Sequence, residues 1–245
     1  MHPSDAAPRP PEDFAAVLAA DEPLLIVGGQ AVNLWALYYR DETRDFAPFV
    51  SRDADILGDR DTLRLLGKLA GKKPQFFPLK PPTNEVGVVI ASDSTGAPML
   101  IEVLRYVKGA SNEALRHPAY SFSIGQPPVI VRAPGPIVLL QAKVANLAEL
   151  NQRDRQDGRH ILILNRLMPS YLAALRDSAV GGRLDERKLI GFLEQLRKII
   201  LSAHGREACT DLAIEPRSFF AGLDPTDLPK LQSFLEKRLP RTLSR

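Results

Sequence analysis

The chain has 245 residues, 44% hydrophobic and 25% charged, which is the composition of an ordinary globular protein. Its 32 basic and 29 acidic residues are interleaved and leave a formal net charge of only +3, so the charge alone is weak evidence for nucleic acid. The single Cys209 excludes an intramolecular disulfide and a cysteine-based zinc site, and the lack of a membrane-length apolar run or a secretory start predicts a cytoplasmic protein with no membrane partner.

Residues 1–12 contain four prolines and few large apolar groups, which predicts an irregular arm without fixed structure. Phe14, Val17 and Leu18 then follow helical spacing and predict a short helix. The Trp35, Tyr38 and Tyr39 cluster further on has two interpretations, core packing or a platform on which a base stacks.

An apolar run at 24–27 breaks at Gly28-Gly29 and continues with helical spacing to residue 38. This pattern predicts a buried strand that turns sharply into a helix, because glycines let the backbone turn tightly. The free N–H groups and the dipole at such a helix start suit a phosphate group.

Asp53 and Asp55 stand two residues apart just before Ile56-Leu57. On a strand this spacing puts both carboxylates on one face, where they repel one another unless a cation lies between them. Mg²⁺, or Mn²⁺, near a phosphate is the natural candidate. The alternative is a surface strand with two solvated aspartates.

The following residues predict a helix over 60–69 and strands over 76–79, 86–91 and 99–104, the last two joined by a hairpin turn. We therefore expect a mixed sheet with at least one antiparallel pair, and two further strands within 111–132. Glu102 lies in an apolar strand, where an unpaired charge is costly. It either completes a metal site with the aspartates or faces outward from a half-exposed strand.

The segment 133–136, rich in proline and glycine, predicts a boundary between a core over 1–133 and a helical part over 134–245. The next helix carries Lys143 at the edge of its apolar stripe, where we expect a half-buried lysine that interacts with a partner group. Residues 153–157 are expected to open another helix, with Asp154 and Asp157 on one face. Amphipathic patterns predict further helices over 185–204 and 227–238.

Taken in order, these motifs resemble the signature of the polymerase-beta-like nucleotidyltransferase superfamily, which is an apolar strand, Gly-Gly or Gly-Ser, a helix, and then Asp-x-Asp. The closest branch is that of the AbiEii-like abortive-infection nucleotidyltransferases, and the resemblance covers about residues 24–165. It implies an α/β (α+β) fold, a mixed sheet with flanking helices and a helical C-terminal part. It also implies transfer of a nucleoside monophosphate from a nucleoside triphosphate, the donor substrate, to an acceptor hydroxyl, with Asp53, Asp55 and Glu102 holding Mg²⁺ or Mn²⁺.

By the same resemblance the nucleotide would contact residues of the glycine turn, of the Asp-x-Asp strand and of the two later helices. Members often have serine beside the glycine, whereas Gln30 follows the pair in this chain. Lys143 would approach the phosphates, while Asp154 and Asp157 would support the pocket or the nucleophile. Those two aspartates have a plain alternative, since acidic residues in a first helical turn also stabilise the helix dipole. The implied nucleotide-binding residues are Gly28, Gly29, Gln30, Ser51, Lys143, Asp154 and Asp157.

Three functions compete. The first is a nucleotidyltransferase acting on RNA, such as tRNA, or on protein, as a toxin with an antitoxin partner. The second is a small-molecule nucleotidyltransferase resembling the aminoglycoside-modifying enzymes, and the third is a non-catalytic nucleotide-binding protein. A positive rim around the metal site favours RNA, an acidic pocket wall favours a cationic small molecule, and a Glu102 that points away from the aspartates favours the third.

Overall fold

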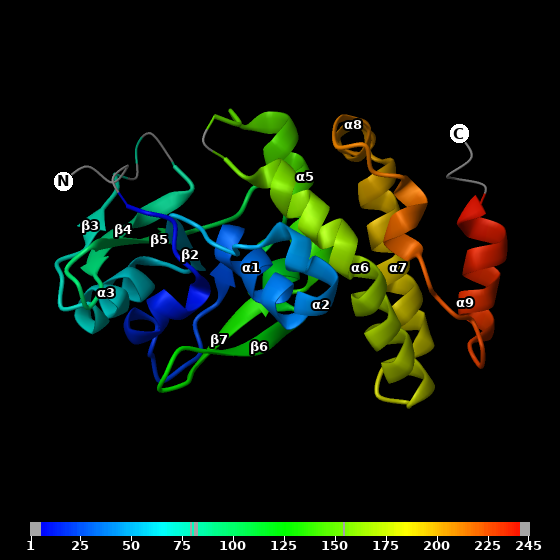
Figure 1. The fold of residues 1–245 in the computed structure, drawn as a ribbon, viewed down its shortest axis with the longest axis horizontal. Helices are drawn as coiled ribbons and strands as arrows, with labels where there is room; N and C mark the ends of the chain where they lie inside the picture. Colours follow the sequence, from blue (N-terminus) through cyan, green and yellow to red (C-terminus); the bar gives the residue numbers. More distant parts are fainter. Residues whose placement is uncertain (1–5, 79, 81–82, 154, 241–245) are drawn as a thin grey trace.

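The computed structural model describes residues 6–78, 80, 83–153 and 155–240, and it has a mixed α/β fold (Figure 1). One sheet has five strands in the order β1-β2-β5-β4-β3, with β2 and β5 parallel and the other neighbours antiparallel. The expected mixed sheet with an antiparallel hairpin is therefore confirmed. The strands are β1 (Ile26–Val27), β2 (Asp53–Leu57), β3 (Gln75–Phe76), β4 (Glu85–Ser92), β5 (Pro98–Leu104), β6 (Ala119–Ile124) and β7 (Val129–Pro134).

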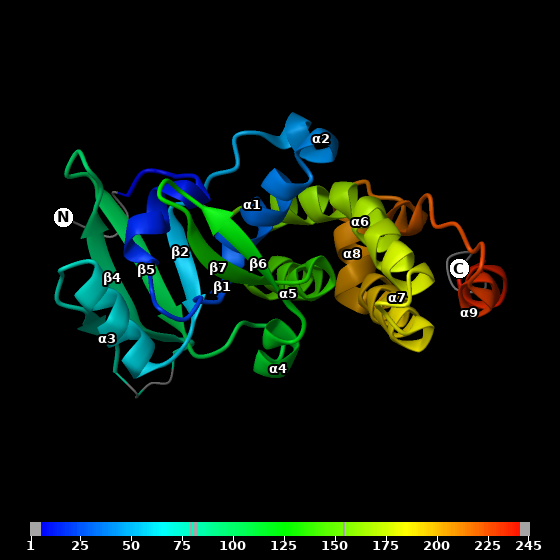
Figure 2. The ribbon, with the colours of Figure 1, turned by 90° about the horizontal axis from the view of Figure 1, so that it is seen from below.

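Strands β6 and β7 form a separate antiparallel pair beside β1 (Figures 1 and 2). Leu25, just before β1, forms a parallel bridge with Arg132 of β7, whose backbone N–H donates to the Leu24 carbonyl at 2.8 Å. The two strands expected within 111–132 are therefore present, and they form their own two-stranded sheet, which contacts the larger sheet next to β1.

Helices flank the sheets and make up the C-terminal part, with α7 and α9 at the far end from β3 (Figure 1). Helix α3 begins as its sequence requires, since the Asp59 side chain accepts hydrogen bonds from the backbone N–H groups of Asp61 and Thr62. The α-helices are α1 (Gly28–Tyr38), α2 (Arg40–Thr43), α3 (Arg60–Leu69), α4 (Asn112–Arg116), α5 (Pro136–Glu149), α6 (Asp157–Val180), α7 (Glu186–Leu201), α8 (Ala203–Asp211) and α9 (Pro229–Ser233). The described residues also form 3₁₀ helices over Pro11–Val17, Arg44–Phe46 and Pro216–Phe220 and a π-helix over Phe234–Arg238.

The N-terminal segment differs from the expected irregular arm. From residue 6 onward it lies against the sheet, with Ala6 buried and the backbone of Arg9 paired with that of Ser51. The Arg9 guanidinium also forms an ion pair with Asp93 at 2.7 Å. Backbone pairing of this kind needs no large apolar side chain, which is why composition did not reveal it. Residues 1–5 lie outside the described part.

One hydrophobic cluster extends from Phe14 to Phe234 and includes buried residues on both sides of residue 133. The division into parts over 1–133 and 134–245 thus remains a prediction. Trp35 belongs to this cluster, with 3% of its surface exposed and its indole N–H donating to the Pro134 carbonyl, whereas Tyr38 is 69% exposed. Tyr39 is partly buried against the same cluster and stacks on the Trp35 ring, so the core interpretation holds for Trp35 and Tyr39 but not for Tyr38. Within the described residues no helix combines the length and apolarity needed to cross a bilayer.

Candidate active site

A cleft of about 760 Å³ opens between the sheet and the helices that follow it. Its walls come from the first turn of α1, from β2 and β5, and from α5 and the start of α6. This volume lies in the range of pockets that bind small molecules. Of the expected site residues in the described part of the chain, all except Gln30 line it: Gly28, Gly29, Ser51, Asp53, Asp55, Glu102, Lys143 and Asp157.

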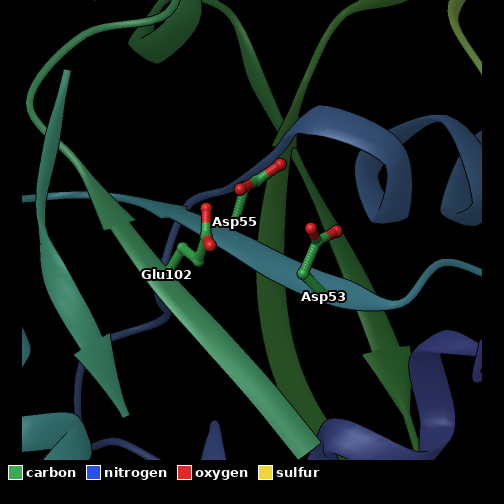
Figure 3. A group of neighbouring side chains, drawn as sticks. All are labelled: Asp53, Asp55 and Glu102. Atoms are coloured by element: carbon green, nitrogen blue, oxygen red, sulfur yellow. The ribbon is translucent and has the colours of Figure 1, made fainter. Parts of the chain in front are cut away.

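Three carboxylates meet on one wall of the cleft. Asp53 and Asp55 alternate along β2, and Glu102 lies opposite Asp55 in the parallel register of β5. Each offers one carboxylate oxygen, and these oxygens all lie within 4.8 Å of one another. Figure 3 shows the three side chains on the same side of the two strands. Glu102 therefore points toward the aspartates and not outward.

The environment of Asp55 disfavours its negative charge. Burial raises the pKa of Asp55 well above its ordinary value, and the neighbouring charges of Asp53 and Glu102 raise it further. Lys143 and Arg155 act in the opposite direction but do not cancel the effect. Binding of either a proton or a cation at Asp55 would therefore reduce the repulsion between its carboxylate and those of Asp53 and Glu102.

The environment of Glu102 also disfavours its negative charge. Burial, followed by the charges of Asp53 and Glu85, raises the pKa of Glu102 to about 7, with only Arg155 opposing. Three converging carboxylate oxygens are the hard donor set that Mg²⁺ and Mn²⁺ prefer. The residues present therefore fit such an ion.

The glycine turn stands directly beside this cluster. Gly28 has a φ of +65°, and a Cβ atom there would lie 1.8 Å from Oδ2 of Asp55. At Gly29 a Cβ atom would lie 2.9 Å from Oγ of Ser51, which itself donates to Asp53 at 3.0 Å. Glycine is required at 28 by conformation and by space, and helix α1 begins there with free N–H groups beside the carboxylates.

A buried ion pair forms the opposite wall. The Lys143 ammonium donates to Asp157 at 2.9 Å, and the Arg155 guanidinium donates to the other oxygen of Asp157 at 2.6 Å. Burial acts to raise the pKa of Asp157, but the charge of Lys143 and the hydrogen bond from Arg155 hold it below its ordinary value. Lys143 is 5% exposed, so it is buried and not half-buried as the stripe predicted.

Helix α6 begins at Asp157, so Arg153, Arg155 and Gln156 precede the helix and do not open it as expected. Asp157 is nevertheless in the first helical turn, where the dipole favours a carboxylate. Asp154, its expected neighbour on the same face, lies outside the described residues.

Gln30 lies apart from the cleft, although the resemblance placed it at the nucleotide. Its buried side-chain amide donates to the Arg9 carbonyl at 2.9 Å, and its oxygen accepts from Asn33 at 3.1 Å. The side chain fixes the N-terminal segment against α1. It points there because the second residue after the turn is rotated about 200° around the helix from Gly28 at roughly 100° per residue.

Sequence reasoning missed His160, which lines the cleft from α6 and is 4% exposed. The available signal was its spacing, since a residue three positions after Asp157 lies on the same face of a helix. It also missed Glu85, which lines the acidic wall from β4.

Comparison with protein-family models, curated proteins and solved structures found no match for this chain. Geometry and charge therefore carry the functional inference. The sheet side of the cleft presents carboxylates, and the helix side presents Lys143, Arg153 and Arg155. A cation on the first wall and a polyanion against the second would satisfy both charges.

Proposed function

We propose that the chain is a metal-dependent nucleotidyltransferase that moves a nucleoside monophosphate from a nucleoside triphosphate to an acceptor hydroxyl. The observation that carries the proposal is the convergence of Asp53, Asp55 and Glu102 within 4.8 Å, directly beside the Gly28 turn. A triphosphate needs both features, because its charge must be neutralised and its oxygens must find donors.

Asp53 and Asp55 would hold Mg²⁺ or Mn²⁺, and Glu102 would complete the donor set. When bound, such ions would supply positive charge that offsets the negative charge developing on the phosphates during in-line displacement. The acceptor oxygen forms its bond to the α-phosphorus as the bond to the β-phosphate oxygen breaks, and pyrophosphate leaves. Glu102, whose carboxylate converges with those of Asp53 and Asp55, accepts the proton of the acceptor hydroxyl.

The remaining residues position the donor. Backbone N–H groups at Gly28 and Gly29 face the phosphates, and Ser51 orients Asp53 through its hydrogen bond. Lys143 contributes positive charge from the opposite wall, where Asp157 fixes its ammonium group. These groups bind and align the triphosphate, and such positioning is a large part of how proteins catalyse phosphoryl transfer.

The charge at the mouth of the cleft favours RNA as the acceptor over a cationic small molecule. Arg52, Arg153 and Arg155 are exposed and line the cleft, so the carboxylates stand behind a positive rim. A toxin that modifies RNA such as tRNA, or protein, and that is neutralised by an antitoxin remains part of this proposal. The non-catalytic alternative loses its main support, because Glu102 faces the aspartates.

The test is transfer of label from each α-labelled nucleoside triphosphate in the presence of Mg²⁺ and either total cell RNA or lysate protein. The labelled product identifies donor and acceptor together. Asp53→Asn and Asp55→Asn keep side-chain size but weaken a ligand of a hard cation, so transfer should fall by orders of magnitude. Asp41→Asn, at an exposed position outside the cleft, is the matched control and should transfer like wild type.

If Asp55→Asn transfers label at the wild-type rate while the wild-type protein is active, the carboxylates are not the catalytic centre. The binding-protein alternative would then replace the proposal.

A further inference from the structure

His160 is a buried polar residue of the cleft that has no role in the mechanism described above. His160 is 4% exposed, and neither its Nδ1 nor its Nε2 atom has a hydrogen-bond partner among the residues that the structure describes. Buried polar groups are almost always hydrogen-bonded, because desolvating them without compensation is unfavourable. A ring that lines a cleft with both nitrogens unpaired is therefore suited to a ligand.

The position of the ring identifies which part of a ligand it would meet. A Cβ atom on Gly29 would lie 3.2 Å from Cε1 of His160, so the imidazole edge lies against the first turn of α1. That helix has 11 residues, and the N–H groups of its first turn have no partner within the helix. The imidazole and the helix start thus converge on one place, where an anion would be bound.

The charges around His160 keep its ring neutral. Burial lowers the pKa of His160 well below its ordinary value, and the charges of Lys143, Arg159 and Arg155 lower it further, against the opposing charge of Asp157. A neutral imidazole carries one N–H donor and one acceptor nitrogen. It can donate to a phosphate oxygen without adding a further cation beside Lys143.

We propose that His160 is a phosphate-binding residue whose imidazole N–H donates to an oxygen of the triphosphate chain held at the start of α1. The inference rests on the proposed function and deepens it, because it adds a side-chain donor where Gln30 is turned away. The proposed hydrogen bond from His160 involves only the polyphosphate part of the substrate. Tripolyphosphate with Mg²⁺ is therefore a sufficient probe.

Calorimetric titration of tripolyphosphate in the presence of Mg²⁺ tests the assignment with three variants. His160→Phe keeps an aromatic ring but removes the donor, so binding should weaken about tenfold, the effect of losing a hydrogen bond to a charged group. His160→Gln restores an N–H donor and should lie closer to wild type. His204→Phe, outside the cleft, is the matched control and should bind like wild type.

A packing role predicts a different pattern, in which His160→Phe folds and binds tripolyphosphate as wild type does. That result would overturn the assignment. Nitrogen NMR of the histidine side chains in the wild-type protein provides a test that does not depend on any variant folding. The donor nitrogen of His160 should shift on saturation with Mg²⁺ and tripolyphosphate, and an unchanged His160 signal at saturation would also overturn it.

The outcomes separate this inference from the proposed function. Wild-type protein that binds no tripolyphosphate contradicts both. Binding that is unaffected in His160→Phe contradicts the role of His160 alone. Binding that depends on His160, without label transfer to any acceptor, supports this assignment and contradicts the proposed catalysis.

Discussion

Replacing Glu102 by glutamine is expected to stabilise the protein when no divalent ion is present. Burial and the charges of Asp53 and Glu85 raise the pKa of Glu102 to about 7, against an ordinary 4.5. Between these two values the folded state binds more protons than the unfolded state, so the free energy of unfolding falls as pH rises through this window. At about 1.4 kcal/mol per pH unit, the ionised carboxylate destabilises the fold by about 3 kcal/mol at pH 8.

Glutamine keeps the size of the side chain and cannot ionise, so Glu102→Gln should recover most of this free energy at about pH 8 and none at about pH 4. Urea denaturation in the presence of a chelator measures the free energy of unfolding of both proteins, with fluorescence of the single tryptophan, Trp35, as the probe. Glu22→Gln, at an exposed position, is the control and should be neutral at both pH values.

Saturating Mg²⁺ should stabilise wild type more than Glu102→Gln, because an ion that binds only the folded state adds its binding free energy to stability. A Glu102→Gln variant no more stable than wild type at pH 8 would refute the claim that the three carboxylates repel one another in the metal-free fold.

Two further substitutions test the walls of the cleft. Gly28→Ala places a Cβ atom 1.8 Å from Asp55 at a φ of +65°, so we expect loss of label transfer and destabilisation beyond the ~1–2 kcal/mol of the backbone conformation alone. Gly71→Ala, at a φ of +61° with open space around the added atom, should show only the conformational part in the same urea assay. Lys143→Met should destabilise by about 3 kcal/mol, since it leaves Asp157 buried with one cationic partner fewer. Combining Lys143→Met with Asp157→Leu should recover much of that loss, and a double variant as unstable as the sum of both changes would contradict the ion-pair explanation.

The features predicted well from the sequence are those fixed over a few residues. The turn at Gly28 followed from an apolar run broken by glycine, and the shared face of Asp53 and Asp55 followed from the two-residue period of a strand. Glu102 could be singled out because a carboxylate is costly within an apolar strand. The resemblance implied that Glu102 joins the metal site, but the parallel pairing of β2 and β5 that brings it opposite Asp55 was not predicted from the sequence.

The features missed depend on packing between distant segments. Gln30 faces the N-terminal segment because the Arg9 carbonyl occupies that side of α1, a contact 21 residues away in sequence. His160 is buried because α6 packs against α1, which periodicity within α6 alone does not specify. Lys143 was expected to need a partner, but only the fold identifies Asp157, from the following helix.

The most direct test of the proposed site is calorimetric titration of a non-hydrolysable nucleoside triphosphate with and without Mg²⁺. If Asp53, Asp55 and Glu102 hold ions that also bind the phosphates, Mg²⁺ should raise the triphosphate affinity of wild type at least about tenfold, and it should have little effect in Asp55→Asn. Equal triphosphate affinity of the wild-type protein with and without Mg²⁺ would contradict a shared metal and phosphate site.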